Sequence, residues 1–476
     1  MSFAEIVNKV NSIAWGPWML ILLVGTGIYL TSRVGFLQLR KFGYAMKNTI
    51  GKIFKKQTAG AGEVTPFQAM STALAATVGT GNIAGVTGAI VVGGPGAVFW
   101  MWLSAFFGMV TKYAEVVLAI RYRERNEKGD WVGGPMYYIK NGLGKNWKWL
   151  GIIFSVLACL AAFGIGNMTQ INTIATSINT AVNSYGVDTS AAVNLFGQEF
   201  LVFNLIIGVV IAAIVGMVLL GGIKRIGAVA EKLVPFMAVV YILASLAVVF
   251  CNLDAVGPIF VSIFKGAFNP SAVMGGFTGT TIMMAIQKGV GRGVFSNEAG
   301  LGSAPMAHAA SSETNPVKQG MYGIFEVFVD TVIICTLTAL VLLCGIHNGM
   351  EVNWGVGGGV ELISASISMV FGQKLGSTIV ALGIVLFALS TVLSWALYGS
   401  RCFEFLFGSK LLPAYQIVFV VVCVIGASME LEVVWNIADT LNGFMAIPNL
   451  IALIGLSGVV TKLTKDHFAQ EKMLKK

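Results

Sequence analysis

The stretch TVGTGNIAG, residues 77–85, decides the fold because it puts polar residues and glycines in the middle of an otherwise apolar segment. QAMSTALAA precedes it and VTGAIVVGG follows it, so the whole segment is long enough to cross a membrane. Backbone groups at membrane depth must be hydrogen-bonded, and an interrupted helix survives there only inside a bundle or against a cavity. Glycine and threonine also let transmembrane helices pack closely, so this cluster alone leaves a binding site and a packing contact both open.

The composition identifies a polytopic membrane protein of the all-α class. Of the 476 residues, 56% are hydrophobic and only 11% are charged, and the mean hydropathy is +0.80. Soluble domains carry about 25% charged residues and lack long apolar runs. Runs long enough for a hydrocarbon core of about 30 Å predict eleven transmembrane helices, at residues 13–31, 66–92, 96–120, 150–181, 201–220, 228–251, 272–288, 318–345, 374–400, 412–428 and 434–460.

The basic residues predict how the chain is oriented in the cell membrane. Seven lysines and arginines lie in residues 33–56 and seven more in residues 121–149, and such residues are enriched in cytoplasmic loops. We therefore expect the N-terminus outside, the C-terminus in the cytoplasm, and Lys288 and Arg292 on the cytoplasmic side. The net charge of +9 follows from this bias and does not indicate a nucleic-acid partner. Residues 36–56 are basic and amphipathic, which is typical of a helix on the inner membrane surface.

A second cluster, GGFTGTT at residues 275–281, interrupts the seventh predicted span as GTGN interrupts the second. The two interrupted helices are five spans apart, an odd number, so they cross the bilayer in opposite directions. Paired interruptions in two inverted halves are the best sequence indication of a secondary transporter's binding site. We therefore predict a single transporter domain, residues 1–476, with a peripheral first helix at 13–31 and inverted repeats at 66–251 and 272–460.

The breaks also predict what the transporter binds. The N-terminus of a half-helix presents free N–H groups and the positive end of a dipole, which favour a carboxylate. The C-terminus of the other half-helix presents carbonyl oxygens, which suit a hard cation. An amino acid that is co-transported with a cation would use both the N–H groups and the carbonyl oxygens. Neither break contains a carboxylate, which favours a metal cation over a proton, and a proton-coupled transporter that uses Glu326 or Asp330 is the alternative.

The motif GGPGAVFWMWLSAFFG, residues 93–108, resembles the signature of the sodium:alanine (alanine/glycine:cation) symporter family. GTGNIAGV before it, GVFSNEAGLGSAP at 293–305 and WNIADTLNGFMAIPNL at 435–450 are similar to the same family, so the resemblance covers nearly the whole chain. The resemblance implies a symporter in the lipid bilayer that takes up alanine with sodium ions, with glycine or D-alanine as further candidates. It also implies the inverted five-plus-five fold of the neurotransmitter:sodium symporters.

This resemblance assigns roles to residues whose local motifs match. Backbone N–H groups at the first break would hold the substrate carboxylate, the second break would meet the ammonium group, and a tryptophan would keep the pocket small. The implied substrate residues are Thr80, Gly81, Asn82, Gln170, Phe277, Thr278, Gly279, Thr280, Thr391 and Trp395. The implied sodium ligands are the hydroxyls of Ser390 and Thr391 and the carbonyls of Ala75 and Val78. No catalytic residue is implied, because the family consists of transporters rather than enzymes.

Other charged residues leave alternatives open. Lys112 and Glu115 lie three residues apart on one helix face, either as a structural ion pair or as part of a gate. Three carboxylates within predicted spans either pair inside the bundle or take part in coupling: Glu326, Asp330 and Asp439.

The remaining motifs argue against other functions. The loop at 293–305 is glycine-rich but lacks the Lys-Ser/Thr of a phosphate-binding loop, so we interpret it as an inner gate with Arg292 and Glu298 as gate charges. The histidines, at 308, 347 and 467, fall outside the apolar runs, and the six cysteines have no metal-binding spacing. A membrane enzyme would need such a constellation. A channel would more often show rings of identical residues from repeated subunits.

Overall fold

The structure of the protein, a computed structural model, describes residues 2–53, 58–195, 198–269, 281–356, 358–428 and 432–474. Nearly all of its regular structure is helical. The first helices are α1 (Phe3–Ala14), α2 (Pro17–Arg33), α3 (Leu37–Arg40), α4 (Phe42–Ile53), α5 (Pro66–Thr77), α6 (Ala84–Gly93), α7 (Ala97–Tyr122), α8 (Pro135–Tyr138), α9 (Lys148–Phe163), α10 (Thr169–Asn183), α11 (Val202–Leu219) and α12 (Gly222–Phe250).

The second part of the chain continues this helical pattern. Its helices are α13 (Leu253–Phe268), α14 (Ile282–Asn297), α15 (Pro305–His308), α16 (Pro316–Val327), α17 (Thr336–His347), α18 (Val360–Phe371), α19 (Gln373–Phe407), α20 (Leu412–Gly426), α21 (Glu432–Gly455) and α22 (Ser457–Leu474). Two antiparallel hairpins pair β1 (Glu124–Arg125) with β2 (Trp131–Val132) and β3 (Ala192–Leu195) with β4 (Gln198–Leu201).

Short 3₁₀ and π-helical segments join several of these helices. They are η1 (Thr80–Asn82), η2 (Ile139–Leu143), η3 (Lys145–Trp147), η4 (Gly164–Met168) and η6 (Phe328–Cys335). The π-helical segment η4 lies between α9 and α10, and η6 lies between α16 and α17. π-Helical turns inside long helices often mark functional sites.

The predicted class, a polytopic all-α membrane protein, is confirmed. Among the described residues, eight helices are long and apolar enough to cross a membrane, and a bent pair makes nine when counted as one span. The predicted count of eleven is not confirmed. The helix α20 has 15 residues, short for a span, and the predicted span at 272–288 falls largely on residues 270–280, outside the described part. The predicted surface helix at 36–56 corresponds to α3 and α4.

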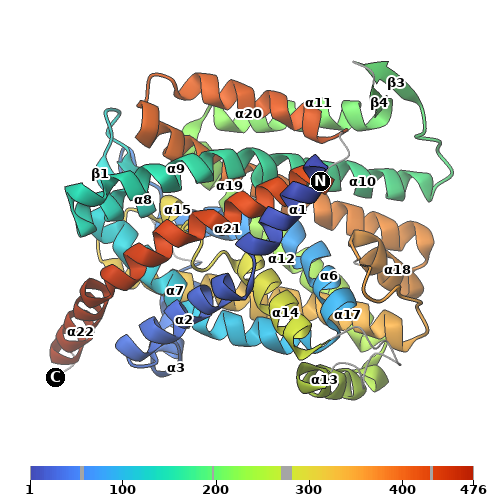
Figure 1. The fold of residues 1–476 in the computed structure, drawn as a ribbon, viewed down its shortest axis with the longest axis horizontal. Coiled ribbons are helices and arrows are strands. Elements are labelled where there is room, and N and C mark those ends of the chain that lie inside the picture. Colours follow the sequence, from blue (N-terminus) through green and yellow to red (C-terminus); the bar gives the residue numbers. More distant parts are fainter. Residues whose placement is uncertain are drawn as a thin grey trace.

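The long helices α9, α10, α11, α20 and α21 run roughly along the long axis of the molecule (Figure 1). One end of the bundle, which we name the C-terminal face, carries β1, α8 and α22. The opposite end, which we name the β3–β4 face, carries that hairpin and α18.

The helix α5 begins and ends where its sequence predicts. Thr65 caps its N-terminus, because its Oγ1 accepts from Gln68 N at 3.1 Å and Gln68 Oε1 accepts from Thr65 N at 3.1 Å. The chain leaves helical geometry after Thr77 and resumes at α6, with a 55° bend between the two halves. This confirms the predicted break in the second span.

A second irregular stretch, residues 298–304, separates α14 from α15 and is buried throughout. Glu298 ends α14 with φ of +55°, and Gly300 and Gly302 have φ of +96° and +83°. Glycine adopts that region at little cost, which explains the glycines of this segment. The sequence analysis interpreted it as a gate loop. The predicted break at 275–281 lies almost wholly outside the described residues and stays a prediction.

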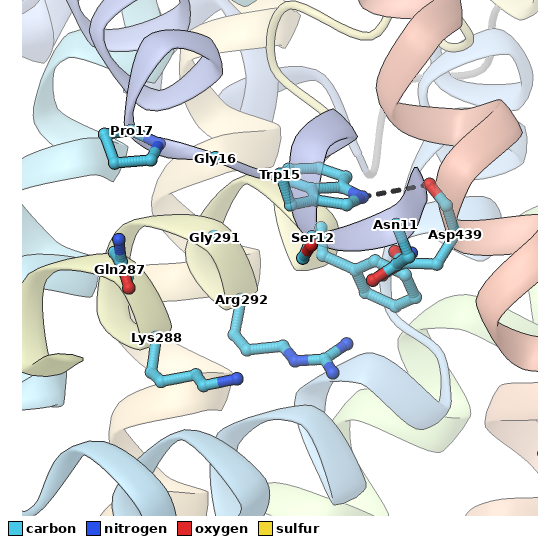
Figure 2. A pocket seen from close by; sticks show the side chains of 11 residues that line it. Asn11, Ser12, Trp15, Gly16, Pro17, Gln287, Lys288, Gly291, Arg292 and Asp439 are labelled. Atoms are coloured by element: carbon cyan, nitrogen blue, oxygen red, sulfur yellow. Dashed lines mark hydrogen bonds between the residues drawn. The ribbon is translucent and has the colours of Figure 1, made fainter. Parts of the chain in front are cut away.

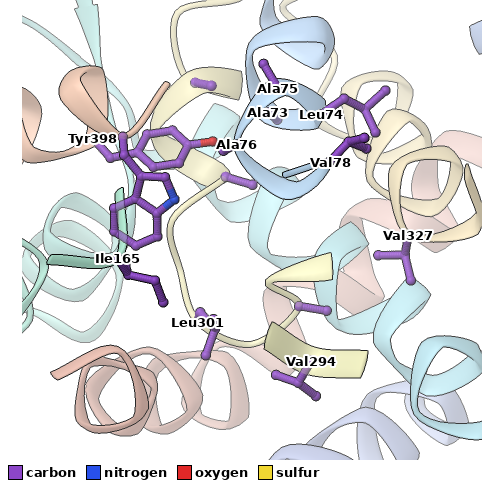
Figure 3. Close-up of a cluster of buried hydrophobic side chains, with 14 of the residues drawn as sticks. Ala73, Leu74, Ala75, Ala76, Val78, Ile165, Val294, Leu301, Val327 and Tyr398 are labelled. Atoms are coloured by element: carbon purple, nitrogen blue, oxygen red, sulfur yellow. The ribbon is translucent and has the colours of Figure 1, made fainter. Parts of the chain in front are cut away.

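Apolar side chains surround both irregular stretches (Figure 3). Ala73 and Ala76 of α5 carry little bulk, which lets neighbouring helices approach the first break closely. Val294 and Leu301 fill the space around the second stretch, and both are buried. The polar groups of the breaks therefore lie in a water-poor interior, where each hydrogen bond and charge counts for more than at a surface.

The closest backbone approach between helices yields the first testable prediction. A Cβ on Gly96, at the start of α7, would overlap the backbone of Gly266 in α13. We expect Gly96→Ala to push the two helices apart and to lower the Tm of the purified transporter in detergent, at an overpacking cost of about 1–3 kcal/mol. Gly257→Ala is the matched control, because a Cβ there meets nothing within 4 Å. An unchanged Tm for Gly96→Ala would contradict this packing.

Candidate functional site

The first break leaves two backbone N–H groups without a protein acceptor. Gly79 N donates to Asn82 Oδ1 at 2.9 Å, and Asn82 N donates to Gly79 O at 3.3 Å. Within the described part of the chain, the N–H groups of Thr80 and Gly81 make no hydrogen bond. An unsatisfied buried N–H costs about 1–3 kcal/mol. These two groups stand at the start of a half-helix, where a negative ligand atom is favoured.

The carbonyl of Ala75, near the other side of the break, faces two hydroxyls of α19. Ser390 Oγ donates to Ala75 O at 3.2 Å, and Thr391 Oγ1 donates to it at 3.0 Å. All three residues are buried. A set of hydroxyl and carbonyl oxygens suits a hard monovalent cation. The structure thus brings together three of the four predicted sodium ligands, and the fourth, Val78, is buried directly after α5.

Five of the six predicted substrate residues that the structure describes meet in a small central cavity. Thr80 Oγ1 donates to Gln170 Oε1 at 3.1 Å, which fixes α10 against the break. The cavity measures about 20 Å³, room for about one water molecule. Binding of even a small amino acid therefore requires the surrounding side chains to move. The predicted residues in its walls are Thr80, Gly81, Gln170, Thr391 and Trp395.

Among the described residues, one predicted substrate residue does not line this cavity. Asn82 is turned away from it, because its side chain bonds Gly79 and donates to Asp330 Oδ1 at 2.6 Å. The predicted ammonium contacts at the second break lie outside the described residues: Phe277, Thr278, Gly279 and Thr280.

The indole of Trp395 forms one wall of the cavity and is held on two sides. Its Nε1 donates to Glu298 Oε1 at 3.0 Å. A Cβ on Gly166, in the π-helical segment η4, would overlap the Trp395 side chain, so only glycine leaves room for the ring there. The second oxygen of Glu298 accepts from Ser303 Oγ. The tryptophan is therefore positioned by the π-helical segment η4 and by the second irregular stretch.

Sequence reasoning missed several wall residues, which come from distant segments. They are Ile165 in η4, Phe295 and Glu298 at the end of α14, and Asn442 in α21. The available signal was the motif GVFSNEAGLGSAP, because an Asn-Glu pair followed by glycines inside a membrane protein marks an irregular buried segment. We had interpreted that motif as a gate. Glu298 places a carboxylate at the cavity, which the sequence analysis did not expect there.

Asp330 links the first break to the end of α14 through hydrogen bonds from neutral side chains. Its Oδ1 accepts from Asn82 Nδ2, and its Oδ2 accepts from Ser296 Oγ at 2.9 Å and Thr331 Oγ1 at 2.8 Å. Asn297 Nδ2 donates to Thr331 Oγ1 at 3.0 Å and extends this network. Asp330 thus connects the first broken helix with α14 and η6. The carboxylate was a candidate for pairing inside the bundle, and its pairing with the break itself was not predicted.

The suggested ion pair between Lys112 and Glu115 does not form. Glu115 Oε1 accepts instead from the N–H groups of Gly300 and Gly302, at 3.0 and 3.1 Å, and from Asn449 Nδ2 at 2.6 Å. Lys112 is fully buried, and its Nζ has no hydrogen-bond partner among the described residues. The i,i+3 spacing was a weak indication, because backbone N–H groups of the irregular stretch compete for the same carboxylate.

Glu326 pairs with His308, a histidine that lies outside the predicted apolar runs. His308 Nε2 lies 2.6 Å from Glu326 Oε1, and both side chains are fully buried. Gln319 Nε2 lies 2.9 Å from His308 Nδ1, and Ser311 Oγ donates to Gln319 Oε1 at 3.0 Å. This network lies between the second irregular stretch and the C-terminal face, so it packs beneath the central cavity rather than in it.

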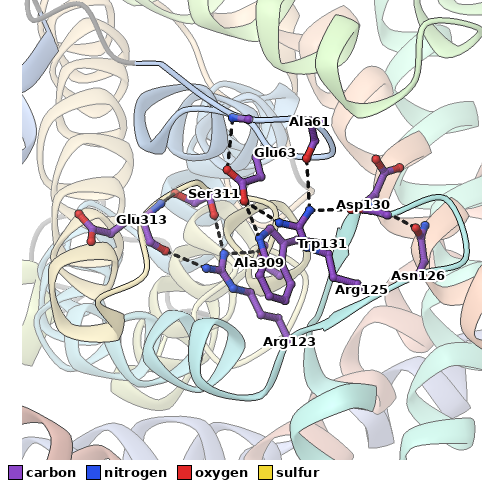
Figure 4. Close-up of polar contacts among 12 residues, drawn as sticks. Ala61, Glu63, Arg123, Arg125, Asn126, Asp130, Trp131, Ala309, Ser311 and Glu313 are labelled. Atoms are coloured by element: carbon purple, nitrogen blue, oxygen red, sulfur yellow. Dashed lines mark hydrogen bonds and ion pairs between the residues drawn. The ribbon is translucent and has the colours of Figure 1, made fainter.

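A polar network at the C-terminal face ties the segment before α5 and the β1–β2 hairpin to residues 309–313 (Figure 4). Glu63 Oε1 accepts from Arg125 Nη2 at 2.7 Å and from Trp131 Nε1 at 2.9 Å. Burial raises the pKa of Glu63, but the hydrogen bonds from Trp131 and its other donors outweigh it and hold the pKa below its ordinary value. Arg123 donates to Ser311 O at 2.5 Å, and burial lowers its pKa to about 10, so it stays charged at neutral pH. The structure is closed on this face.

The structure corrects the predicted position of two cations. Lys288 and Arg292 line a cavity with Gly88 and Gly358, on the side of the break that leads to the β3–β4 face. The sequence analysis placed them on the opposite, cytoplasmic side. The reason is the helix boundary, because α14 extends to Asn297 and does not end at residue 288 as predicted.

A bundle of membrane-crossing helices, interrupted at a buried polar centre that opens toward one face, defines a secondary transporter. The chain belongs to the sodium:alanine symporter family, whose model matches residues 1–476. This confirms the resemblance seen in the sequence motifs. The family consists of transporters, so the chain is a multi-pass membrane transporter and not an enzyme.

Individual relatives agree over nearly the full length. The sodium/alanine symporter AgcS of Methanococcus maripaludis is 48% identical over 98% of this chain and 97% of its own. The probable sodium/glutamine symporter GlnT of Bacillus subtilis is 36% identical over 98% of this chain and 91% of its own. A crystal structure of MhsT in complex with L-phenylalanine matches with a TM-score of 0.58 at 12% identity, over 87% of this chain and 99% of MhsT. That match concerns the fold and supports a likeness to neurotransmitter:sodium symporters.

The contact between the break and α19 yields a second prediction. A Cβ on Gly79 would lie 2.5 Å from Thr391 Oγ1. Gly79→Ala should therefore rotate that hydroxyl away from Ala75 O and weaken sodium binding by about tenfold, the loss of one contact worth about 1.4 kcal/mol. Sodium-dependent thermal stabilisation of the purified protein measures this. Gly85→Ala is the control, because its Cβ meets only the Arg292 side chain at 3.8 Å. Equal sodium responses in all three proteins would refute the assignment.

Proposed function

We propose that the chain is a sodium-coupled symporter of small neutral amino acids, with alanine as its main substrate and glycine or D-alanine as further candidates. The observation that carries this proposal is the arrangement at the first break. The free N–H groups of Thr80 and Gly81 lie on one side, and the carbonyl of Ala75 with two hydroxyls lies on the other. An anion and a cation can therefore bind within a few residues of each other.

Sodium would bind between α5 and α19. The hydroxyls of Ser390 and Thr391 already converge on Ala75 O, and a cation can replace their protons as the partner of that carbonyl. Val78 would add its carbonyl oxygen from the end of α5. All these ligands are neutral, so the bound ion would bring a net positive charge next to the substrate carboxylate. That attraction would couple the binding of the two in a water-poor site.

The amino acid would bind with its carboxylate on the N–H groups of Thr80 and Gly81. Glu298 is the carboxylate that lines the cavity and would face the ammonium group, together with the predicted contacts at 277–280. Gln170 holds Thr80 in place, and Trp395 would limit the side chain to a small group. Relatives are named for alanine and for glutamine, so we infer that the residues around Trp395 set substrate size within the family.

Alternating access would follow from two inverted repeats, residues 66–251 and 272–460, with the helix at 13–31 outside them. The sodium gradient across the cell membrane would drive uptake. The dense positive charge of the C-terminal face supports a cytoplasmic position for that face, with the N-terminus outside. The closed network at Arg123 and Arg125 would then be the inner gate.

A proton-coupled mechanism is the second candidate, because of Asp330. This buried carboxylate bonds the first break through Asn82, and its other hydrogen-bond partners among the described residues are neutral too. An ionised carboxylate without a cation is costly in such a place, so it would carry a proton or accompany a cation. No carboxylate was predicted within the breaks themselves, but Asp330 contacts the first break from η6, so experiment must separate the two candidates.

The sodium ligands provide that experiment. We expect Ser390→Ala and Thr391→Val to raise the sodium concentration for half-maximal alanine uptake by about tenfold each, because each removes one oxygen ligand worth about 1.4 kcal/mol. Uptake into proteoliposomes is measured with sodium or proton gradients imposed separately. Thr378→Ala is the control in the same helix, since its hydroxyl bonds Lys374 O at 2.8 Å and the Tyr185 hydroxyl at 3.2 Å and none of the proposed sodium ligands. Uptake driven by protons alone and abolished by Asp330→Asn would favour the second candidate.

The tryptophan wall provides a separate prediction on substrate size. Trp395→Ala should open the cavity and let serine, valine and leucine compete with alanine, since one methylene changes discrimination by about 1–3 kcal/mol. Trp395→Phe keeps a ring of similar width but loses the hydrogen bond to Glu298, so it should retain the parent's size selectivity. Competition profiles that are the same for all three proteins would show that Trp395 does not line the substrate pocket.

A further inference from the structure

Two cavities lie between the central site and the β3–β4 face. One, of about 380 Å³, lies between the α1–α2 turn, α14 and α21. The other, of about 340 Å³, lies between α6 and α14 and ends on Thr80 and Gly81. Both have Lys288, Arg292 and Phe295 in their walls. We name the two together the vestibule, and Phe295 lies at the point where the vestibule meets the central cavity.

The packing of α14 decides which side chains face the vestibule. Gly289 and Gly293 lie one turn apart on the face that packs against α7, where a Cβ on Gly289 would overlap the Ala97 carbonyl and one on Gly293 would lie 2.7 Å from Ser104 Oγ. Lys288 and Arg292 lie on the adjoining face, which α7 leaves open. Figure 2 shows both side chains extending in the same direction along the cavity wall. Their position therefore follows from backbone packing.

The two cations share a cavity wall with Asp439, which interacts with both electrostatically, but among the described residues they form no direct ion pair. Lys288 is exposed and Arg292 half-buried, and neither makes an ion pair with any carboxylate in the described ranges. Two like charges at i,i+4 destabilise a helix by about 0.2–0.5 kcal/mol, which indicates a role other than stability. Asp439 is the one acid in the walls of either cavity, and its Oδ2 already accepts from Asn11 Nδ2 at 3.2 Å. The described walls carry a net positive charge.

We propose that Lys288 and Arg292 form an outer carboxylate-binding subsite, which holds the amino acid by its carboxylate before it passes Phe295 to the central site. The proposal rests on the proposed function. The route is short, because the Phe295 ring lies 3.2 Å from the position of a Cβ on Gly81. Positive walls around a narrow opening concentrate anions and raise their association rate. The carboxylate then moves from two mobile cations to the fixed N–H groups of Thr80 and Gly81.

The test uses propionate, which has the carboxylate and methyl group of alanine but no ammonium group. We expect calorimetry on the purified parent to detect propionate binding in sodium-free buffer, and the double variant Lys288→Gln/Arg292→Gln to bind it about tenfold more weakly. The control is Lys265→Gln, an exposed cation on α13 outside both cavity walls. It should bind propionate like the parent. Gly79→Ala should also retain propionate binding, because it alters only the central site.

Uptake measurements add a readout that would not change if Lys288 and Arg292 had only a structural role. At constant sodium, raising ionic strength with choline chloride should lower the parent's initial rate at low alanine by several-fold and leave the double variant nearly unaffected. The maximal rate should be the same in both. Equal propionate affinity and equal salt dependence in parent and double variant would overturn the subsite. Loss of propionate binding in Gly79→Ala at unchanged Tm would overturn it too, because propionate would then occupy the central site.

The two proposals fail separately. Propionate binding that depends on Lys288 and Arg292, in a protein that shows no sodium-driven alanine uptake, would refute the proposed function and leave the subsite standing. Sodium-driven uptake with no effect of the double variant on propionate binding would refute the subsite and leave the proposed function standing.

Discussion

The structure depends on one constraint: backbone groups freed by a broken helix in a membrane must find partners inside the protein. Each unsatisfied group in hydrocarbon costs several kcal/mol. The chain meets this cost with one polar side chain at the first break and one at the irregular stretch 298–304. Asn82 accepts the Gly79 N–H at the first break, and Glu115 accepts the N–H groups of Gly300 and Gly302 in the irregular stretch. Both side chains are buried, and both act as caps that water cannot replace.

These caps also determine which groups remain free for a ligand. Once Asn82 holds Gly79, the next two N–H groups, at Thr80 and Gly81, have no acceptor in the described residues. Asn82 in turn donates to Asp330, so the amide that shapes the break is itself oriented by a carboxylate on η6. Asn449 does the same for Glu115 from α21. The binding groups are therefore fixed by a second layer of contacts drawn from helices far apart in the sequence.

This division explains what the sequence could predict. The break at GTGN was predictable because glycines and an asparagine inside an apolar run are a local signal. The Glu115 cap was not, because Asn449 lies 334 residues away and the spacing of Lys112 and Glu115 suggested a pair within one helix. The predicted side for Lys288 and Arg292 was wrong. That prediction counted charges beyond helix ends estimated from hydropathy, and α14 extends past the estimated end. His308 does lie outside the apolar runs, but its burial against Glu326 was not predictable, because the partner that compensates its polarity comes from another helix.

The two faces of the site are closed by interactions of very different strength. Toward the C-terminal face, main-chain bonds between Val64 and residues 310–312 and the contacts of Arg123 hold the start of α5 and the end of α7 against the segment that follows α15. Toward the β3–β4 face, the side chain of Phe295 stands between the central cavity and the vestibule. Solvent-exposed ion pairs such as Arg125–Glu63 contribute about 0–1 kcal/mol each. A ligand that draws Phe295 and the first break together needs to shift the equilibrium between the conformations open to each face by only a few kcal/mol. Under the proposed function, binding at Thr80 and Gly81 would supply energy of that order, and occupation of the site would decide which face opens.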